Sequence, residues 1–336
     1  MTEAAENAKN EEVLLSVENL SIGLREGKDV FPVVDGVSYR VKQGEILGVV
    51  GESGCGKTVT NLAVMGLLPP SLFVQGGRIL FEGQDLAALP EKERSRINGS
   101  RIAMIYQEPL TSLNPLLRIG TQVAEPLRIH EELSKEEIRE RVVKALTEVG
   151  LPDPEGILSC YPHQLSGGQR QRVMIAMATI CRPDLMIADE PTTALDVTVQ
   201  ARILRLLKHI SVKHCMSVLF ISHDLAVISQ ICDRVMVMYA GRICEIAGTD
   251  ELMHHPLHPY TQGLLRSIPT RESRGEDLPV IPGHVPSVTE KRTPCPFAGR
   301  CPLAMKICLE KAPEPSEAAP GHFVSCHAVS ERRQDV

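Results

Sequence analysis

The segment from Gly51 to Thr58 reads G-E-S-G-C-G-K-T and constrains the fold of this chain more than any other stretch. It matches the G-x-x-x-x-G-K-[ST] pattern, in which glycines let the backbone curl until several N–H groups point at one phosphate. The apolar stretch 45–50 before it favours a buried strand, and 59–68 favours a helix that ends before two prolines. A strand, a phosphate loop and a helix N-terminus in this order predict an α/β fold that binds a nucleotide.

The loop supplies most of the residues that we expect to contact the nucleotide. Lys57 is expected to reach the outer phosphates, and the Thr58 hydroxyl is expected to ligate Mg²⁺. A chance glycine-rich turn is the alternative reading of the motif taken alone. The predicted nucleotide-binding residues of the loop are Gly51, Glu52, Ser53, Gly54, Cys55, Gly56, Lys57 and Thr58.

A second apolar stretch ends in two carboxylates. Leu185–Glu190 reads L-M-I-A-D-E, as expected for a buried strand followed by acidic residues at its carboxyl end. Beside a phosphate loop, Asp189 would hold Mg²⁺, directly or through water, and Glu190 would polarise the water that attacks the phosphate. The alternative is a strand that simply ends in an acidic turn. Together with the loop at Gly51, the pair favours hydrolysis of a nucleoside triphosphate.

The order of strands and helices divides the chain of 336 residues into three parts, the second of which contains an insert. Residues 1–12 are polar and acidic and predict a disordered tail. Residues 13–254 alternate strands with helices, which predicts an α/β domain with a mainly parallel sheet. Within it, about 108–164 is interrupted by prolines and then shows helical spacing, which indicates a helical insert with a capping box at Ser134 and Glu137. Residues 255–336 are rich in proline and lack periodicity, which indicates a small C-terminal appendage.

Charge and hydropathy exclude several classes of protein. The net charge is −6 and tryptophan is absent, so a nucleic acid is disfavoured as the main partner. No run of 18 apolar residues occurs, so no segment is expected to span a bilayer alone. The N-terminus is not a signal peptide by its pattern. We therefore expect a cytoplasmic protein whose membrane role, if any, depends on partner chains.

The stretch 165–172, L-S-G-G-Q-R-Q-R, resembles the signature of ATP-binding-cassette (ABC) ATPases. Ser and Gly residues that open a helix form a second anion-binding nest, which one ATP in the same chain does not need. The resemblance implies that this nest completes the ATP site of a second, facing subunit. It also implies a parallel sheet core with an antiparallel β subdomain and a helical subdomain. The residues expected to form the nest are Ser166, Gly167, Gly168 and Gln169.

Three further positions match the same family in order. Gln107, in Y-Q-E-P, resembles the glutamine that senses Mg²⁺ and the attacking water at the start of the helical insert. Asp196, in T-A-L-D, resembles the D-loop that links the two facing sites. His223, in I-S-H-D, resembles the switch histidine that contacts the γ-phosphate. For the aromatic residue that stacks on adenine, Phe31 and Tyr39 are both candidates and Phe31 is favoured, although packing in the core would also explain it.

Two segments resemble the oligopeptide, dipeptide and nickel importer branch of the family, closest to the D-type subunit. They are 110–115 (L-T-S-L-N-P) and 255–265 (H-P-L-H-P-Y-T-Q-G-L-L). The resemblance implies a peripheral, ATP-hydrolysing subunit on the cytoplasmic face of the inner membrane. Its partners would be two permease subunits, a solute-binding protein and a second ATPase, in a heterodimer or a homodimer. The cargo is expected to be a peptide, with nickel or glutathione as alternatives. A non-transport ABC ATPase and a redox or metal sensor are the rival functions.

Four of the ten cysteines crowd into the C-terminal appendage. Four thiolates in a small, proline-rich segment suggest a metal that stabilises it, and cysteine ligation suits either Zn²⁺ or an iron–sulfur cluster. The family resemblance favours a [4Fe–4S] cluster, and His322 and His327 would be further ligands if the metal were zinc. Four unconnected thiols are the alternative. The cysteines are Cys295, Cys301, Cys308 and Cys326, spaced C-x₅-C-x₆-C-x₁₇-C.

Overall fold

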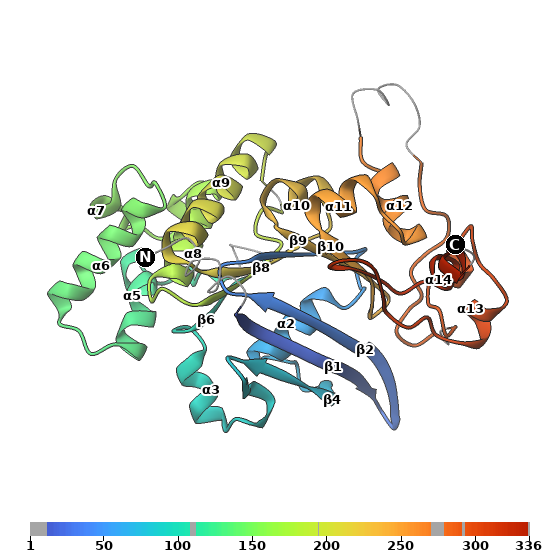
Figure 1. Cartoon of the computed structure of the whole chain (residues 1–336). Helices are drawn as coiled ribbons and strands as arrows, with labels where there is room; N and C mark the ends of the chain where they lie inside the picture. The colour runs from blue at the N-terminus through green and yellow to red at the C-terminus, as the bar shows by residue number, and fades with distance from the viewer. Residues whose placement is uncertain (1–11, 108–111, 194, 270–278, 291–292, 335–336) are drawn as a thin grey trace. The chain divides into compact units, whose positions relative to one another are not determined.

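The computed structural model describes residues 12–107, 112–193, 195–269, 279–290 and 293–334 (Figure 1). The predicted disordered tail therefore lies almost wholly outside the described residues, as do Leu110 and Thr111 of the L-T-S-L-N-P segment. The chain forms two compact units that interleave in the sequence. The first comprises Met1–Leu14, Val41–Glu45 and Ala88–Ile221, and the second comprises Leu15–Arg40, Ile46–Ala87 and Ser222–Val336. Each unit is described by itself below.

The first unit contains three parallel strands. They are β6 (Ile102–Ile105), β7 (Leu185–Asp189) and β8 (Ser217–Ser222), and β7 pairs with both of the others. Every residue of β7 and β8 is buried. A strand covered on both faces is apolar throughout and does not alternate, which is the pattern of L-M-I-A-D. The strand predicted within 185–190 is confirmed, and the parallel pairing places the carboxyl ends of β6, β7 and β8 at one edge.

Helices make up the rest of the first unit. The helices α5, α6 and α8 pack against one another, and α8 also packs on β6 (Figure 1). The capping box predicted at the start of α6 is present, because the Ser134 side chain accepts from the Glu137 N–H and the Glu137 side chain accepts from the Ser134 N–H. The helices of this unit are α3 (Glu91–Ile97), α5 (Ile119–His130), α6 (Lys135–Glu148), α7 (Pro154–Ile157), η2 (Pro162–Gln164), α8 (Gly167–Thr179) and α9 (Val197–His214).

The second unit contains a four-stranded antiparallel sheet in the order β2-β1-β4-β5. Its long strands alternate buried and exposed residues over part of their length, as expected when one face is packed and the other is open. This sheet corresponds to the antiparallel subdomain that the family resemblance implied. Its strands are β1 (Val13–Glu26), β2 (Asp29–Lys42), β4 (Leu72–Phe81) and β5 (Gln84–Asp85), followed by η1 (Leu86–Ala88).

A mixed set of strands forms the other sheet of the second unit. Strand β3 (Ile46–Val50) is parallel to β9 (Arg234–Tyr239), while β10 (Arg242–Gly248) is antiparallel to β9. The two residues between β9 and β10, Ala240 and Gly241, both have positive φ values, 44° and 82°. A two-residue turn of this kind allows only a hairpin. The prediction of a mainly parallel sheet is therefore correct for β3 and β9 and incomplete for β10 and the strands beyond it.

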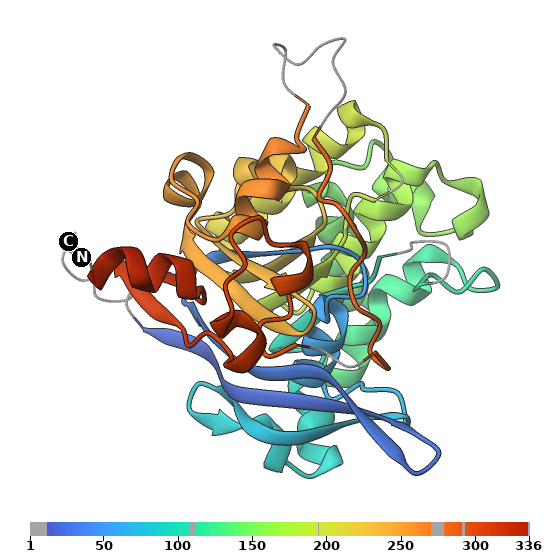
Figure 2. The ribbon, with the colours of Figure 1, turned by 90° about the vertical axis from the view of Figure 1, so that its right-hand side faces the viewer.

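The C-terminal residues extend this second sheet. Strand β12 (His322–Val324) pairs with β10, and β11 (Ser316–Ala319) pairs with β12. Figure 2 shows this segment, in red, beside the orange strand β10. The helices of the second unit are α2 (Lys57–Met65), α10 (Leu225–Ile231), α11 (Thr249–His254), α12 (Pro259–Arg266), η3 (Ala298–Arg300), α13 (Ile307–Glu310) and α14 (His327–Gln334).

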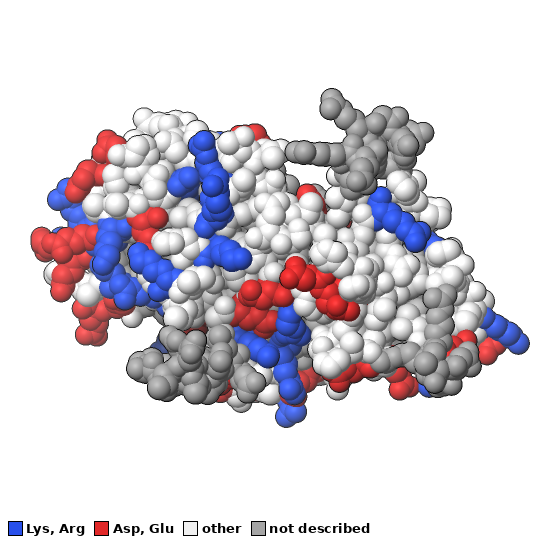
Figure 3. Space-filling view, turned by 45° about the horizontal axis from the view of Figure 1, so that its top comes forward, with Lys and Arg blue, Asp and Glu red and all other residues white. Residues whose placement is uncertain are grey.

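Two surface properties bear on the partners of the chain. Within the described ranges, no helix combines the length and the apolar character needed to cross a bilayer. On the face shown in Figure 3, acidic and basic side chains are interspersed over the helical region at the left, where α6 and α7 lie in Figure 1. Interspersed charge differs from the basic stripe expected of a duplex-binding surface.

Candidate functional site

The phosphate loop connects β3 to α2 in the second unit, as its sequence predicts. Gly54 and Gly56 have φ values of 77° and 101°, which only glycine adopts without strain. A Cβ atom on Gly51 would lie 2.2 Å from the Met238 carbonyl oxygen, so this position has no room for a side chain. Gly56 is the N-cap of α2 and makes no side-chain capping hydrogen bond. The N-terminus of α2 is therefore shaped to present its N–H groups to an anion.

Lys57 is folded back over this loop. Its Nζ donates to the Gly51 carbonyl oxygen at 2.7 Å and to the Glu52 carbonyl oxygen at 3.1 Å, and the residue is 6% exposed. Its Nζ also lies 3.7 Å from the Cys55 sulfur. Burial raises the pKa of the Cys55 thiol, with Lys57 acting in the opposite direction. Thr58 is exposed, so its hydroxyl is accessible to a cation. The predicted helix over 59–68 begins earlier and ends at Met65, because Gly66 takes a left-handed C-cap with φ 67°.

Glu190 lies at the centre of the acidic group in the first unit. Its carboxylate Oε2 accepts from the Gln107 side-chain amide at 3.1 Å and from the Thr193 hydroxyl at 2.9 Å. Its backbone N–H donates to the Ile221 carbonyl oxygen at 3.1 Å, and its φ is 47°. A non-glycine residue in the left-handed region is strained, and such strain is concentrated at functional sites. The structure thus brings Gln107 to Glu190, two residues that the sequence places 83 positions apart.

Asp189 precedes Glu190 as the last residue of β7 and is 4% exposed. A buried carboxylate at the carboxyl end of a parallel strand is a suitable ligand for Mg²⁺, either directly or through water. Glu190 follows Asp189 in the chain and bonds to Gln107, and carboxylate and amide oxygens are ligands that Mg²⁺ accepts. The chemistry of this donor set fits the predicted cation.

Ser166 is the N-cap of α8 in the first unit, so the second predicted nest opens a helix. Ser166 Oγ accepts from the Gln169 N–H at 3.3 Å, and the Gln169 side chain accepts from the Ser166 N–H at 2.9 Å. This is a complete capping box. A Cβ on Gly168 would lie 3.0 Å from Val199 Cγ1, which explains a glycine at that position.

The other predicted site residues are placed as follows. Asp196 is the N-cap of α9 and accepts from the Val199 N–H at 2.9 Å. Its neighbour Ala194 lies outside the described residues. His223 is exposed directly after β8. Phe31 is half-buried, whereas Tyr39 is 4% exposed.

The four C-terminal cysteines lie near one another in the second unit. Burial, together with the neighbouring thiols of Cys308, Cys326 and Cys301, raises the pKa of the Cys295 thiol to about 11. Burial likewise raises the pKa of the Cys301 and Cys326 thiols. Backbone N–H groups of Phe297, Leu303, Ala328 and Val329 bond to these sulfur atoms and act against that rise.

The predicted metal site is not supported by this arrangement. Among the residues that the structure describes, no group of three or more His, Cys, Asp or Glu side chains is arranged to hold a metal ion. Raised thiol pKa values favour neutral thiols, and neutral thiols pack as small apolar groups. Zinc ligation by His322 is not supported either, because its Nε2 bonds to Glu245 Oε1 at 2.7 Å. His327 bonds to the Lys311 carbonyl oxygen at 2.9 Å.

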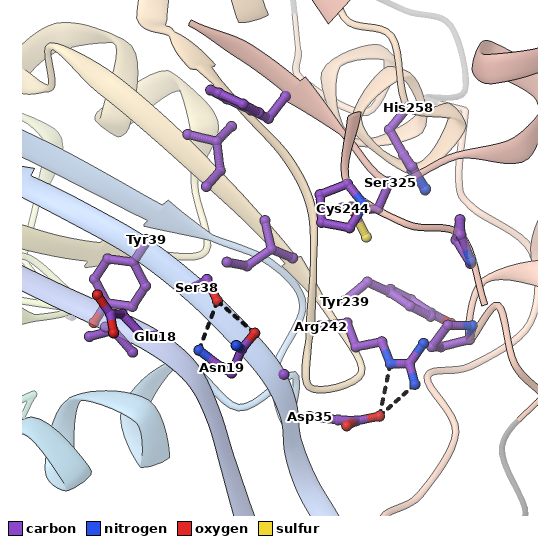
Figure 4. Close-up of a pocket in the computed structure, with 18 of the residues that line it drawn as sticks. Glu18, Asn19, Asp35, Ser38, Tyr39, Tyr239, Arg242, Cys244, His258 and Ser325 are labelled. Carbon is purple, nitrogen blue, oxygen red and sulfur yellow. Dashed lines mark hydrogen bonds and ion pairs between the residues drawn. The ribbon is translucent and has the colours of Figure 1, made fainter. Parts of the chain in front are cut away.

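A cavity of about 670 Å³ lies between β1, β2, the β9–β10 hairpin and the C-terminal segment (Figure 4). No residue of the phosphate loop lines it, so it is separate from the expected triphosphate position. The Arg242 guanidinium donates to Asp35 at 3.0 Å, and the Ser38 hydroxyl donates to Asn19 at 3.3 Å (Figure 4). At one end, burial lowers the pKa of His258 to about 4, so its ring is neutral.

Sequence reasoning missed two residues that contact the phosphate loop. Tyr260 Oη accepts from the Glu52 N–H at 2.9 Å, and the Arg300 guanidinium bonds to the Glu52 carboxylate at 2.7 Å and 3.1 Å. Tyr260 belongs to the H-P-Y-T segment, which carried a family signal but no role. Nothing in the sequence indicated a contact between Arg300 and the loop, because Arg300 lies 248 residues from Glu52 and in no recognisable motif.

Two family models match this chain. Residues 34–193 match the ABC transporter family, and residues 244–308 match the oligopeptide/dipeptide transporter C-terminal region. The first match contains the phosphate loop, Gln107, the Ser166 nest and Glu190. The second contains Tyr260 and Arg300.

Curated relatives match along almost the whole chain. A probable peptide ABC transporter ATP-binding protein of Sinorhizobium fredii (strain NBRC 101917 / NGR234) is 48% identical over 95% of this chain and 96% of the relative. The dipeptide transport ATP-binding protein DppD of Bacillus subtilis (strain 168) is 47% identical over 96% of this chain and 97% of the relative. DppD of Escherichia coli (strain K12) is 45% identical over 94% of this chain and 96% of the relative.

Solved structures match the cassette part. The dimeric structure of a bacterial ABC transporter cassette is 27% identical with a TM-score of 0.63, over 70% of this chain and 98% of that chain. The same identity, coverage and TM-score hold for a dimeric post-hydrolysis state bound to ADP and Pi.

Proposed function

This chain belongs to the ABC transporter family of ATP-binding proteins, and from that premise we propose that it is the ATP-hydrolysing subunit of a membrane importer for dipeptides or oligopeptides. The phosphate loop and the signature nest are the two parts of such an ATPase that the chain itself supplies. The names of the relatives, dipeptide transport and probable peptide ABC transporter ATP-binding proteins, support peptides as the cargo.

The match of residues 244–308 to the oligopeptide/dipeptide transporter C-terminal region carries this proposal. An ABC cassette alone is shared by proteins with many functions, so it indicates ATP hydrolysis and leaves the coupled process open. The C-terminal match separates peptide importers from ABC ATPases that act on nucleic acids or ribosomes. The net charge of −6 also disfavours a nucleic-acid partner.

ATP binding is assigned to the phosphate loop. The N–H groups at the start of α2 would bond to the phosphates, and the Lys57 ammonium would leave the Gly51 and Glu52 carbonyl oxygens to reach the outer phosphates. Phe31 is the residue proposed to stack on adenine, because Tyr39 is buried. When bound, Mg²⁺ would neutralise phosphate charge, with Thr58, Gln107 and Asp189 as its proposed ligands.

Hydrolysis is assigned to Glu190. Its carboxylate would orient a water molecule for in-line attack on the γ-phosphate, with His223 as the proposed contact to that phosphate. Gln107 already bonds to the Glu190 carboxylate at 3.1 Å, so nucleotide-dependent movement of Gln107 would change the position of the catalytic group. Gln107 also begins the helical insert, which is the proposed contact with the membrane subunits.

A facing subunit is proposed to complete the site. The Ser166–Gln169 nest would bond to the γ-phosphate held by the partner, and Asp196 would link the two sites. The partner is proposed to be a second homologous ATPase, in a heterodimer or a homodimer, with two permease subunits and a solute-binding protein. The complex would place this chain on the cytoplasmic face of the inner membrane, since no described helix of its own spans a bilayer.

The four C-terminal cysteines are proposed to hold a [4Fe–4S] cluster, with zinc as the alternative. Mutual proximity of four thiols, and N–H donors directed at three of the sulfur atoms, suit thiolate ligation once a metal displaces the protons. Anaerobic purification should then give a brown protein with visible absorption that Cys308→Ser removes, whereas the matched variant Cys215→Ser, outside the group, should retain it. A colourless protein with bound zinc by elemental analysis would favour zinc, and no metal by either method would contradict the proposal.

Transport by the assembled importer tests the function. Proteoliposomes with permeases, binding protein and this chain should take up a radiolabelled dipeptide only with ATP, and Glu190→Gln should abolish uptake. Nickel and glutathione, the alternative cargoes, should not be taken up at a comparable rate. ATP-driven uptake of nickel or glutathione without peptide uptake would overturn the peptide assignment, and ATP hydrolysis without any uptake would favour a non-transport ATPase.

A further inference from the structure

Glu52, the second residue of the phosphate loop, is fixed at three points. Its N–H donates to Tyr260 Oη at 2.9 Å, and its carbonyl oxygen accepts from Lys57 Nζ at 3.1 Å. Its carboxylate accepts from both terminal nitrogens of Arg300, at 2.7 Å and 3.1 Å. Two of these three attachments come from the C-terminal region and one from the loop itself. The position of Glu52 therefore depends on residues more than 200 positions away.

Arg300 uses its full donor capacity in this contact. A guanidinium has five N–H groups. Besides the two bonds to Glu52, Nε donates to the Pro282 carbonyl oxygen at 2.8 Å, Nη2 to the Ile281 carbonyl oxygen at 3.1 Å and Nη1 to the Tyr239 hydroxyl at 3.3 Å. The side chain is 9% exposed. A two-pronged guanidinium–carboxylate pair fixes direction as well as distance, and lysine cannot reproduce that geometry.

The Tyr260 hydroxyl is fixed by the packing of its ring. Tyr260 is fully buried, and its ring meets Tyr239 edge-on at 4.7 Å between centroids and Phe297 at 5.3 Å. Its N–H donates to His258 Nδ1 at 3.0 Å. Ring packing and backbone bonding leave little freedom for the hydroxyl, so the Glu52 N–H is held by a rigid acceptor.

We propose that Arg300 and Tyr260 are positioning residues for the ATPase, which act through Glu52 to keep the phosphate loop curled for nucleotide binding. The inference rests on the proposed function and adds a regulator within the same chain. Neither residue needs to touch ATP. Loss of either would let the loop relax, so that the nucleotide must order it on binding, and affinity would fall more than the rate of the chemical step.

The same contacts couple the loop to the cysteine segment. Arg300 immediately precedes Cys301, and Phe297 follows Cys295 by two residues. The Cys295 N–H donates to the Cys308 carbonyl oxygen at 3.0 Å, which joins two parts of that segment. A change in the conformation of the cysteine segment would therefore reach Glu52 through Arg300, and the C-terminal region would set the affinity for ATP.

Nucleotide affinity of full-length variants tests the proposal, measured by titration with a fluorescent ATP analogue in parallel with thermal unfolding. Arg300→Met should weaken binding about tenfold, which corresponds to about 1.4 kcal/mol, with a much smaller change in kcat than in KM. Arg300→Lys should recover only part of the loss. Arg242→Met is the matched control, because it breaks a guanidinium–carboxylate pair with Asp35 and a bond to the Pro294 carbonyl oxygen without contacting Glu52. Arg242→Met should leave nucleotide affinity unchanged.

Two further variants keep the test decisive. Tyr260→Phe removes one oxygen and keeps the ring, so it should fold and bind about threefold more weakly even if Arg300→Met unfolds. Glu52→Gln combined with Arg300→Met should be no worse than either alone, because both break one contact. Unchanged affinity in Arg300→Met and Tyr260→Phe, or strictly additive losses in the double variant, would overturn the proposal. If Lys57→Ala abolishes binding while these variants do not, only the positioning role fails; if Lys57→Ala also binds normally, the proposed function fails.

Discussion

The two anion-binding helix ends of this chain are built in opposite ways. At α2 the N-cap is Gly56, without a side-chain cap, and the loop before it is shaped by glycines and fixed from outside at Glu52. At α8 the N-cap is Ser166, and a capping box with Gln169 satisfies two N–H groups, those of Ser166 and Gln169. No side chain caps the first helix end, whereas the second is held by its own capping box.

This difference fits two different partners. A phosphate that the same chain binds can meet an N-terminus that no side chain caps. A phosphate presented by a facing subunit arrives only on assembly, and a nest held by its own capping box keeps its shape until then. On this account the facing phosphate would meet the Gly167 and Gly168 N–H groups, which the capping box does not use, while the loop at α2 exchanges its Lys57 contacts. The comparison can be tested by variants that affect one end, the other end or neither.

Glu190 belongs to neither helix N-terminus, so its replacement should slow hydrolysis without weakening the binding of the phosphates. Glu190→Gln keeps the shape and the bonds to Gln107 and Thr193 but removes the carboxylate charge. The ATPase rate should fall on the order of 1000-fold, because the attacking water is no longer polarised. Equilibrium binding of ATP should stay within about twofold. A steady-state phosphate-release assay beside a nucleotide titration gives both values, and undiminished turnover would remove Glu190 from the mechanism.

Lys57 is the first residue of α2, so its replacement should affect only the anion site at that helix. Lys57→Ala should weaken ATP binding about 100-fold, because a charge-assisted contact to the outer phosphates is lost. The exposed Lys208 of α9 is the matched control, and Lys208→Ala should bind ATP as the parent chain does. Isothermal titration of both variants measures the contrast. Equal affinities in the two variants would show that α2 does not carry the triphosphate.

His258 bonds to the backbone of Tyr260, whose hydroxyl bonds to Glu52 of the phosphate loop. Burial lowers the pKa of His258 to about 4 from an ordinary 6.5. Between these values the unfolded chain binds a proton that the folded chain excludes, so stability should fall as the pH drops through this window. At pH 5 the loss should be about 2 kcal/mol relative to pH 7 from this group. His258→Gln should remove that part of the pH dependence. Urea unfolding at both pH values measures it, and identical pH profiles for the two proteins would contradict the assignment.

Ser166 and Ser134 cap α8 and α6 with the same capping box, so they form a matched pair. Replacement of either by alanine should lower the free energy of unfolding by about 1 kcal/mol. Only Ser166→Ala should also lower the ATPase rate of the assembled importer. Urea unfolding and phosphate release on both variants give the comparison. If Ser134→Ala slowed hydrolysis as much as Ser166→Ala, the nest at α8 would be no more than a helix cap.

The sequence predicted those parts of the fold in which local pattern and pairing agree. Strands β3, β7 and β8 were predictable because they are continuous apolar runs, and the capping box of α6 was predictable from two residues three apart. The antiparallel continuation through β10, β12 and β11 was not, because pairing partners such as Glu245 and Val324 are distant in sequence. Short strands with polar residues, such as β11, give no periodic signal.

The candidate site divides in the same way. Motif residues such as Lys57, Glu190 and Ser166 were predictable because their chemistry requires fixed spacings. The role expected for Gln107 came from a family resemblance and not from spacing, and its contact with Glu190 was not predicted. The Arg300–Glu52 pair was not predictable, because a salt bridge between distant segments leaves no local pattern. Metal ligation by the four C-terminal cysteines stays a prediction: their thiols are neighbours, and the described residues contain no group arranged to hold a metal ion.

The most direct test of the account is ATP binding and ATP hydrolysis by one variant of the assembled importer, Ser166→Arg. The bulky side chain would block the nest at α8 and leave the loop at α2 untouched. The account predicts that ATP binds to the Gly51–Thr58 loop with unchanged affinity while hydrolysis at the site that this nest completes falls at least about 100-fold. Hydrolysis at the full rate with Ser166 replaced would contradict the proposal that two subunits enclose each triphosphate.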